Sequence, residues 1–128
     1  MPQAKQLSAA LANKPGMLAE LTGGLAGEGI GLQALMVFEG RARFLVSDLV
    51  KAKEAVRRLG LQVFEDEVLT VEIEPRAGAF GRIARKIADA GVNIDYCYTG
   101  GARSEGRVMG VFVVSDLGKA LNAVGDSP

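Results

Sequence analysis

The chain has 128 residues, of which 48% are hydrophobic and 23% charged, and its fifteen basic residues balance its fifteen acidic residues. A neutral chain does not attract a phosphate backbone or an anionic membrane, so we expect it to bind neither nucleic acid nor membrane. No window suits a membrane span or a secretory core, so we expect a cytoplasmic protein. One cysteine and no histidine exclude a zinc site, a Ser-His-Asp triad and a Cys-His dyad, so we expect no enzymatic activity, metal or cofactor.

The chain opens with a predicted strand at 5–12, which is followed by a helix. Leucines recur at helical spacing in this helix, and Gly29 after it suits a left-handed cap. An alternating apolar pattern at 30–38 predicts a second strand, and a glycine-containing turn leads to a third strand that ends in Val-Ser-Asp. We therefore expect the order βαββ at the start of the chain.

A second helix and a fourth strand complete the first half. Ser47 or Asp48 can cap the amino end of this helix, which runs to Gly60, and the apolar segment 61–64 follows as a short strand. The resulting order, βαββαβ, is the ferredoxin-like arrangement. It is an α+β fold in which one antiparallel sheet carries two helices on one face.

The second half repeats the first at an offset of 62 residues, so that Leu7 falls on Leu69. The offset grows to 68 where FLVSDL from Phe44 matches FVVSDL from Phe112. The repeat predicts strands at 67–74 and 92–98, a third strand, and helices that end at Gly91 and Gly125.

No segment remains at the end of the chain for the second copy's fourth strand. That strand is either dispensable or supplied by another chain. We predict two ferredoxin-like units in tandem, at 1–65 and 66–128. Because a core of about sixty residues is marginal, we also expect the halves to share an interface and the protein to form a homodimer.

The junctions between the first strand and the first helix of each half are the most informative stretches. In Asn13-Lys14-Pro15-Gly16-Met17-Leu18, Asn13 can cap, Pro15 fits a first helical turn, and Gly16 lets a ligand approach the backbone. The first amides of a helix suit a carboxylate. The second junction keeps the glycine as Gly78 and adds Arg76. The alternative is that proline and glycine merely start a helix.

The second strand of the second half predicts a polar face. By alternation, one face carries Asn93, Asp95 and Cys97 and the other carries Val92, Ile94, Tyr96 and Tyr98. Asn93 and Asp95 could hold an ammonium group, or could form a polar edge that faces water. We interpret Cys97 as a small buried hydrophobic residue on a strand.

Two stretches, NKPGMLAELTGGLAGEGIGLQAL and EPRAGAFGRIARKIADAGVNIDY, resemble the ACT domain, in which N-x-P-G-x-L opens the first helix and G-(I/V)-N-I opens the second strand. The resemblance covers nearly the whole chain, which is most similar to small stand-alone bacterial proteins with two ACT domains. It implies a non-catalytic regulatory protein that binds a free amino acid or similar small carboxylate between paired domains.

Residue by residue, the resemblance implies two pockets. The first combines Asn13, Pro15, Gly16, Met17 and Leu18 with Asn93, Ile94 and Asp95 of the other half. The second combines Gly78, Ala79 and Phe80, beside Arg76, with Gly31, Leu32 and Gln33. The second pocket departs from the family pattern, because Gly31 replaces its asparagine and the N-x-P-G order is absent.

Three other functions are open to a chain of this element order. It could be a dimerisation partner that regulates a separate metabolic enzyme without a ligand of its own. An acylphosphatase-like enzyme needs an arginine in the first loop and an asparagine, which Arg76 and Asn93 supply in a different sequence context. An RNA-binding module needs exposed aromatic residues on its first and third strands, where this chain has only Phe44 and Phe112.

Overall fold

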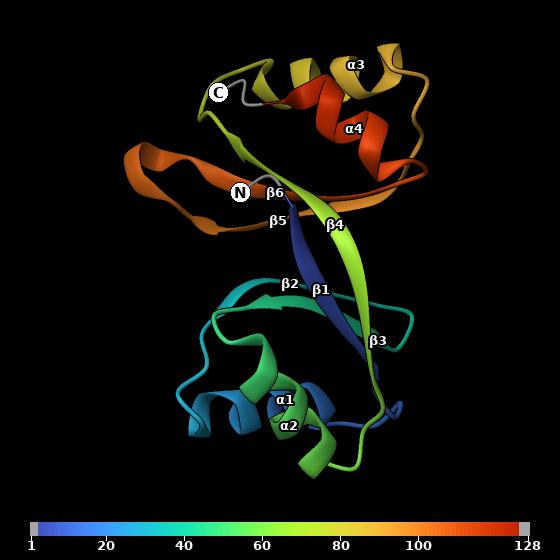
Figure 1. Cartoon of the computed structure of the whole chain (residues 1–128). Coiled ribbons are helices and arrows are strands. Elements are labelled where there is room, and N and C mark those ends of the chain that lie inside the picture. The colour runs from blue at the N-terminus through green and yellow to red at the C-terminus, as the bar shows by residue number, and fades with distance from the viewer. Residues whose placement is uncertain (1–2, 126–128) are drawn as a thin grey trace. The chain divides into compact units, whose positions relative to one another are not determined.

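A computed structural model describes residues 3–125, which form six strands, four helices and one short 3-10 helix (Figure 1). All four strand pairings within the two units described below are antiparallel, and this confirms the predicted α+β class. In chain order the elements are β1 (Gln3–Ala10), α1 (Met17–Gly27), β2 (Leu32–Phe38), β3 (Arg41–Val46), α2 (Leu49–Arg58), β4 (Val63–Ile73), α3 (Ala79–Asp89), β5 (Ile94–Ala102), η1 (Ser104–Gly106), β6 (Val108–Val114) and α4 (Leu117–Val124).

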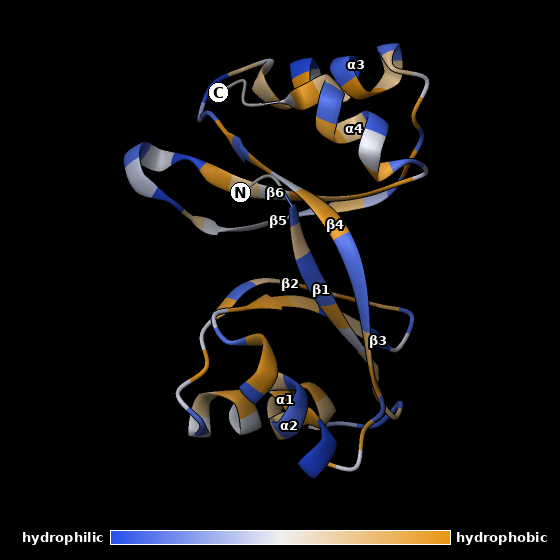
Figure 2. Ribbon diagram, viewed as in Figure 1, coloured by the Kyte–Doolittle hydropathy of each residue, from blue (hydrophilic) through white to orange (hydrophobic). Residues whose placement is uncertain are grey.

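The chain divides into two compact units, and the division falls inside β4. The first unit is Lys5–Asp66, and the second contains residues 67–125 together with residues 3–4. The prediction of a separate short strand at 61–64 is wrong, because β4 runs without a break from Val63 to Ile73. The acidic run 65–67, which is blue in Figure 2, contains no glycine or proline that would end a strand.

The first residues of β1 belong to the second unit. At the offset of 62, residues 3–4 correspond to 65–66, the last residues of the first unit. Residues 3–4 are therefore grouped with the second unit, and 65–66 with the first. The sequence had left two other interpretations, in which the fourth strand of the second copy is dispensable or is supplied by another chain.

The first unit is built on three strands in the order β1-β3-β2, to which Val63–Asp66 of β4 is added. Leu7 lies opposite Phe44, and Phe38 lies opposite Arg41 across the β2–β3 hairpin. The two residues of its turn are both left-handed, with φ of 50° and 75° at 39 and 40, as the twist of a tight hairpin requires. Helices α1 and α2 lie together on one side of these strands (Figure 1). Their apolar faces pack on the buried residues Leu7, Ala9, Ala42 and Phe44.

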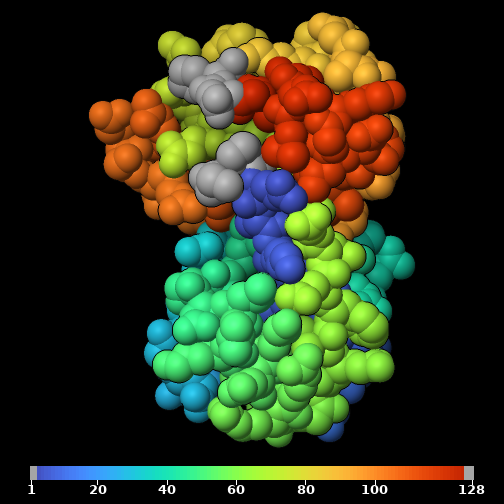
Figure 3. Space-filling view, viewed as in Figure 1, coloured from blue at the N-terminus to red at the C-terminus, as the bar shows by residue number. Residues whose placement is uncertain are grey.

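The second unit repeats this arrangement with the order β4-β6-β5. Leu69 lies opposite Phe112, and the same Glu-Gly pair turns the β5–β6 hairpin, with φ of 60° at Glu105 and 74° at Gly106. Helices α3 and α4 lie together on one side of the strands (Figure 1), and α4 forms much of the second unit's surface in the view of Figure 3. The core beneath them contains Leu69, Ile87, Val92, Phe112, Ala120 and Val124.

The helix boundaries follow local signals. The carboxylates of Asp48 and Asp116 cap α2 and α4 by accepting from the amides of Lys51 (3.1 Å) and Lys119 (3.0 Å), so the aspartate and not the serine of each Ser-Asp pair is the cap. None of the helices in the described part of the chain combines the length and apolar character that a bilayer crossing demands.

Candidate ligand-binding site

Both leading helices begin after a left-handed glycine. Gly16 precedes α1 with φ of 90°, and Gly78 precedes α3 with φ of 85°. Their carbonyl groups accept from the amides of Glu20 (2.9 Å) and Arg82 (3.0 Å), which closes the first helical turn. Within the described residues, no side chain caps either helix. Amides near the start of each helix therefore point outward at the positive end of the helix dipole, as an anion site requires.

Two predicted roles in the first junction are wrong. Pro15 lies two residues before α1 and not in its first turn, and the side chain of Asn13 does not cap the helix. The reason is that the left-handed Gly16 is itself the cap residue. The turn before it is closed by the backbone, because the amide of Lys14 donates to the carbonyl of Ala12 (2.9 Å).

The second junction has the same turn, in which the amide of Arg76 donates to the carbonyl of Glu74 (2.9 Å). One of its predicted donors is already used, since the amide of Ala79 donates to the carbonyl of Arg76 (3.2 Å) and the side chain of Ala79 is buried. The donors that remain for a ligand at this opening are the amides of Phe80 and Gly81, because the amide of Arg82 already donates to Gly78.

The charges around the two openings differ, which was not predicted. At the offset of 62, Lys14 corresponds to Arg76 and Glu20 corresponds to Arg82. A guanidinium nitrogen of Arg82 lies 3.5 Å from the point where a Cβ on Gly78 would stand. The α3 opening thus has two cations where α1 has one cation and one anion, so an anionic ligand is favoured more strongly at α3. The repeat offset was the signal that could have shown it.

Each opening also has an apolar side chain at the second helical position. Leu18 of α1 and the equivalent Phe80 of α3 are 37% and 40% exposed. The ring of Phe80 lies 5.5 Å from that of the buried Phe112, so part of Phe80 belongs to the core. The exposed parts of these side chains could contact the apolar portion of a small ligand, whereas Met17 is half-buried in α1.

A β-bulge interrupts the second strand of each unit at the same place. The pairing with the third strand shifts between Leu32 and Ala34 in β2, and between Ile94 and Tyr96 in β5. The residues at the two bulges are therefore Gln33 and Asp95, which both came from the sequence as candidate ligand contacts. Bulges re-aim side chains and are over-represented next to active sites.

The bulge overturns the predicted faces of β5. Cys97 was predicted to share a face with Asn93 and Asp95, but it packs with Ile94 against the core of the second unit. The extra residue at the bulge changes the alternation of side chains from that point onward. This contact supports the interpretation of Cys97 as a small hydrophobic residue.

The start of each second strand is fixed by the serine of the Val-Ser-Asp motif. The amide of Gly31 donates to the hydroxyl of Ser47 (2.9 Å), and the amide of Ser47 donates back to the carbonyl of Gly31 (3.0 Å). Asn93 and Ser115 form the same two bonds, at 2.9 Å each. The backbone that precedes each bulge is thus held in the same way in both units.

The structure brings Asn93 and Asp95 together. The side-chain amide of Asn93 donates to one carboxylate oxygen of Asp95 at 2.9 Å, and both residues are exposed. Asp95 forms no ion pair with any residue that the structure describes. The equivalent residues in the first unit are Gly31 and Gln33, which form no such pair.

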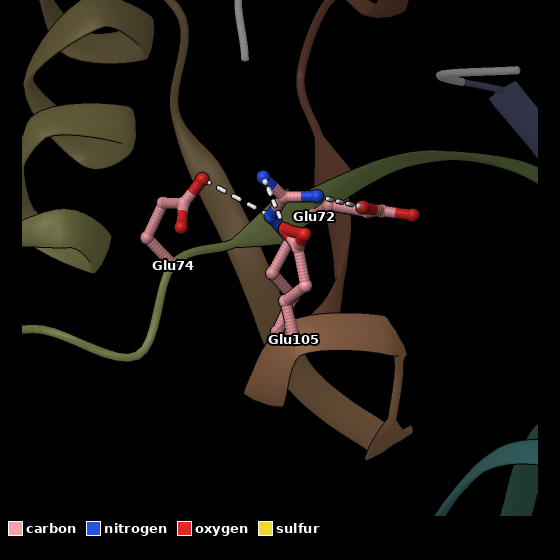
Figure 4. Close-up of polar contacts among 4 residues, drawn as sticks. Glu72, Glu74 and Glu105 are labelled. Carbon is pink, nitrogen blue, oxygen red and sulfur yellow. Dashed lines mark hydrogen bonds and ion pairs between the residues drawn. The ribbon is translucent and has the colours of Figure 1, made fainter.

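A cluster around Arg107 was not predicted (Figure 4). Its guanidinium contacts the carboxylates of Glu74 (3.1 Å), Glu105 (3.4 Å) and Glu72 (3.9 Å). The hydrogen bond and charge of Glu74, and then the charges of the other two, raise the already high pKa of Arg107. Because these contacts join β4 to the β5–β6 hairpin, we interpret the cluster as structural. The equivalent Arg41 instead donates to the hydroxyl of Ser8 (3.4 Å).

The described residues contain no group of three or more His, Cys, Asp and Glu side chains that could hold a metal ion. The joining of each loop with the second strand of the other half, which the family resemblance implies, stays a prediction.

Comparisons with known proteins give relatives among solved structures. Neither a family model nor a curated protein matches the sequence. Protein BT0572 from Bacteroides thetaiotaomicron is 31% identical over 96% of this chain and 87% of that chain, with a TM-score of 0.87. The ligand-free regulatory subunit of aspartate kinase from Thermus thermophilus is 19% identical over 99% of this chain and 92% of that chain, with a TM-score of 0.67. Aspartokinase III from E. coli, in complex with lysine and aspartate, is 16% identical over 95% of this chain and 29% of that chain, with a TM-score of 0.56. The two kinase structures show a shared fold, which is ACT-like.

Proposed function

The chain belongs to the same family as the Bacteroides protein BT0572, and on that premise we propose that it is a non-catalytic regulatory protein that binds a free amino acid or a similar small carboxylate. One observation carries the proposal. Both halves begin their first helix at an exposed left-handed glycine, and no described side chain caps the amides behind it. The first N–H groups of a helix lack an intrahelical partner, and because no described side chain takes them here, they are open to an anionic ligand.

The fold comparison supports a regulatory role. The chain resembles, over almost its whole length, a regulatory subunit of aspartate kinase, and it also resembles part of an aspartokinase that was solved with lysine and aspartate. The chain carries no histidine, which makes general acid-base catalysis at neutral pH difficult. Amino acids are therefore the first ligands to test.

The direct test is isothermal titration of the chain with each of the twenty amino acids, together with thermal unfolding. A ligand that binds only the folded state should add about 2.7 kcal/mol of stability at a hundredfold excess over its Kd. Absence of binding heat and of any thermal shift for all twenty amino acids would refute the proposal.

Substitution of the cap glycines tests whether the helix openings bind the ligand. Asparagine tolerates the left-handed conformation, so Gly16→Asn should keep the backbone while its side chain fills space that is now open. We expect at least a tenfold loss of affinity at that opening, since a charge-assisted hydrogen bond contributes about 1.5–3 kcal/mol. Gly29→Asn is the matched control, because Gly29 is also left-handed and also in open space but lies after α1.

Gly78→Asn and Gly91→Asn form the same pair for α3. Unchanged affinity in both Gly16→Asn and Gly78→Asn would place the ligand elsewhere. Because Arg76 and Arg82 flank the second opening, we expect Gly78→Asn to cause the larger loss for an acidic amino acid.

A role as a regulatory partner without a ligand is the second candidate. It is favoured by apolar side chains that the first unit leaves exposed, of which Phe38 is 61% and Phe64 45% exposed. In the second hairpin, where Ser104-Glu105-Gly106-Arg107 matches Phe38-Glu39-Gly40-Arg41, the residue that corresponds to Phe38 is Ser104. The expected homodimer stays a prediction. Light scattering should give the molar mass of the native chain and of Phe38→Ser, and a lower mass in the variant would show that this surface forms the dimer contact.

A further inference from the structure

We infer that one end of the first unit's sheet is a docking surface for a segment of a partner protein that presents a carboxylate beside an apolar side chain. The surface consists of Phe38, Arg41 and Phe64, and we call it the Phe–Arg–Phe surface. The inference goes beyond the proposed function and does not depend on it, because none of these three residues lies at the opening of α1 or α3.

The three side chains lie on the face of the sheet that the helices do not cover. Ala42 and Val63 pack into the core beneath α1 and α2, so the neighbouring residues Arg41 and Phe64 point to the opposite face. Phe38 lies directly opposite Arg41 in the β2–β3 pairing, and such pairs share a face. The guanidinium of Arg41 lies 5.4 Å from the ring centre of Phe64. Arg41 thus has one aromatic neighbour from β2 and one from β4.

The two rings are open to a partner. Phe38 is 61% exposed and Phe64 is 45% exposed. The fold does not require an aromatic residue at the first position, because Ser104 takes it in the second hairpin. Arginine and aromatic residues that lie together carry much of the binding energy in protein interfaces. The composition of this surface is therefore typical of a site that binds another protein.

The second unit shows which group the surface lacks. There, the equivalent Arg107 contacts the carboxylates of Glu74 (3.1 Å) and Glu72 (3.9 Å) on the neighbouring strand (Figure 4). At the offset of 62, these two glutamates correspond to Ala12 and Ala10, which are both exposed. The first unit therefore keeps the arginine of the hairpin and has small side chains where the second unit has carboxylates.

The charge of Arg41 is accordingly left for a partner. Its guanidinium donates to the hydroxyl of Ser8 (3.4 Å) and forms no ion pair with any residue from 3 to 125. A carboxylate from a partner segment can accept from the remaining donors, while an apolar side chain beside it covers Phe38. An isologous contact between two copies would place this surface against itself, with cation facing cation, so an acidic partner fits it better than a second copy.

The test selects random dodecapeptides displayed on phage against the native chain, with counter-selection on Arg41→Gln. Sequencing should show enrichment of aspartate or glutamate next to an aromatic or aliphatic residue. One enriched peptide is then synthesised in two forms, with its acidic residue and with the corresponding amide. The acidic form should bind the native chain about tenfold more tightly than the amide form.

Substitutions then separate the charge from the apolar contact. Arg41→Gln should lower the affinity for the acidic peptide about tenfold and should leave that for its amide form unchanged. Phe38→Ser should weaken both forms, because it removes apolar contact area. Arg57→Gln and Val50→Ser are the matched controls, since both residues are exposed on α2 of the same unit, and neither should change the affinity.

The double variant Ala10→Glu with Ala12→Glu tests the surface while all three of its residues stay in place. The added carboxylates should pair with Arg41 from within the chain, as happens at Arg107, and should lower the affinity for the acidic peptide about tenfold. A urea midpoint no lower than that of the native chain would show that the double variant is folded.

Three results would overturn the inference: no enrichment over Arg41→Gln, enriched peptides without an acidic residue, or an unchanged affinity in Arg41→Gln. A lower mass of Phe38→Ser in light scattering, with no competition by the peptide for self-association, would assign the surface to a second copy and would also overturn it. Each of these results leaves the amino-acid titrations of the proposed function unaffected, so the two proposals fail separately.

Discussion

Gly110 of β6 is the position where a single added methyl group should be most damaging. A Cβ built there would lie 2.7 Å from Cδ1 of Ile73 and 2.8 Å from Cε1 of Phe112, both closer than carbon atoms approach in folded proteins. Phe112 is fully buried, and the ring of Phe80 lies beside it, so it has little freedom to move. Overpacking of this kind costs about 1–3 kcal/mol, and we expect Gly110→Ala to destabilise the second unit by that amount.

The two tyrosines make this measurable, because both lie in β5 of the second unit and the chain has no tryptophan. The urea midpoint from tyrosine fluorescence should fall in Gly110→Ala. The control is Gly101→Ala in β5, where a Cβ meets nothing within 4 Å and φ is not left-handed. This control should be neutral or slightly stabilising, because alanine restricts the unfolded chain. If Gly110→Ala had the same midpoint as the native chain, the packing argument would be refuted.

Two further predictions concern charged residues of the second unit. Asp116→Ala removes the side-chain cap of α4 and should cost about 1 kcal/mol of stability, measured as a lower urea midpoint. Asn122→Ala in the same helix is the control, and an equal loss in both variants would contradict the capping role. Because the pKa of Arg107 is raised in the folded state, its stabilising effect is complete below its unfolded pKa and is lost only as pH rises through the higher folded pKa. Arg107→Gln should therefore lower the urea midpoint equally at all pH values near neutrality. The loss should shrink in high salt, because these ion pairs are partly exposed, and a loss that does not depend on salt would contradict the electrostatic explanation.

The features that the sequence predicted well depend on local chemistry. Gly29 and Gly91 were expected as left-handed caps, and they have φ of 74° and 75°, with their amides donating to Ala26 (3.0 Å) and Ala88 (2.9 Å). A positive φ strongly favours a residue without a Cβ, so a glycine after a helical pattern can be recognised as its cap without knowledge of the fold. The repeat then allowed the clearer copy to decide the elements of the other, including the β1 strand, which is rich in alanine.

The features that the sequence did not predict depend on how strands pair. Alternation predicted that Cys97 lies on the polar face of β5, but the bulge at Asp95 places its side chain on the face that packs against the core. A bulge is set by the register between two strands, which no single segment contains. The roles of Asn13 and Pro15 failed for a related reason. Both residues are common at helix starts, but the left-handed Gly16 fixes where α1 begins.

The same distinction applies to the residues that lie between the two units in sequence. A strand belongs to a sheet by its pairing and not by its place in the chain, so the segment that extends one unit need not follow the rest of that unit in sequence. Extending the offset of 62 backwards, however, aligns residues 3–4 with 65–66, and the structure assigns 3–4 to the second unit. Each of β1 and β4 therefore begins in one unit and continues in the other.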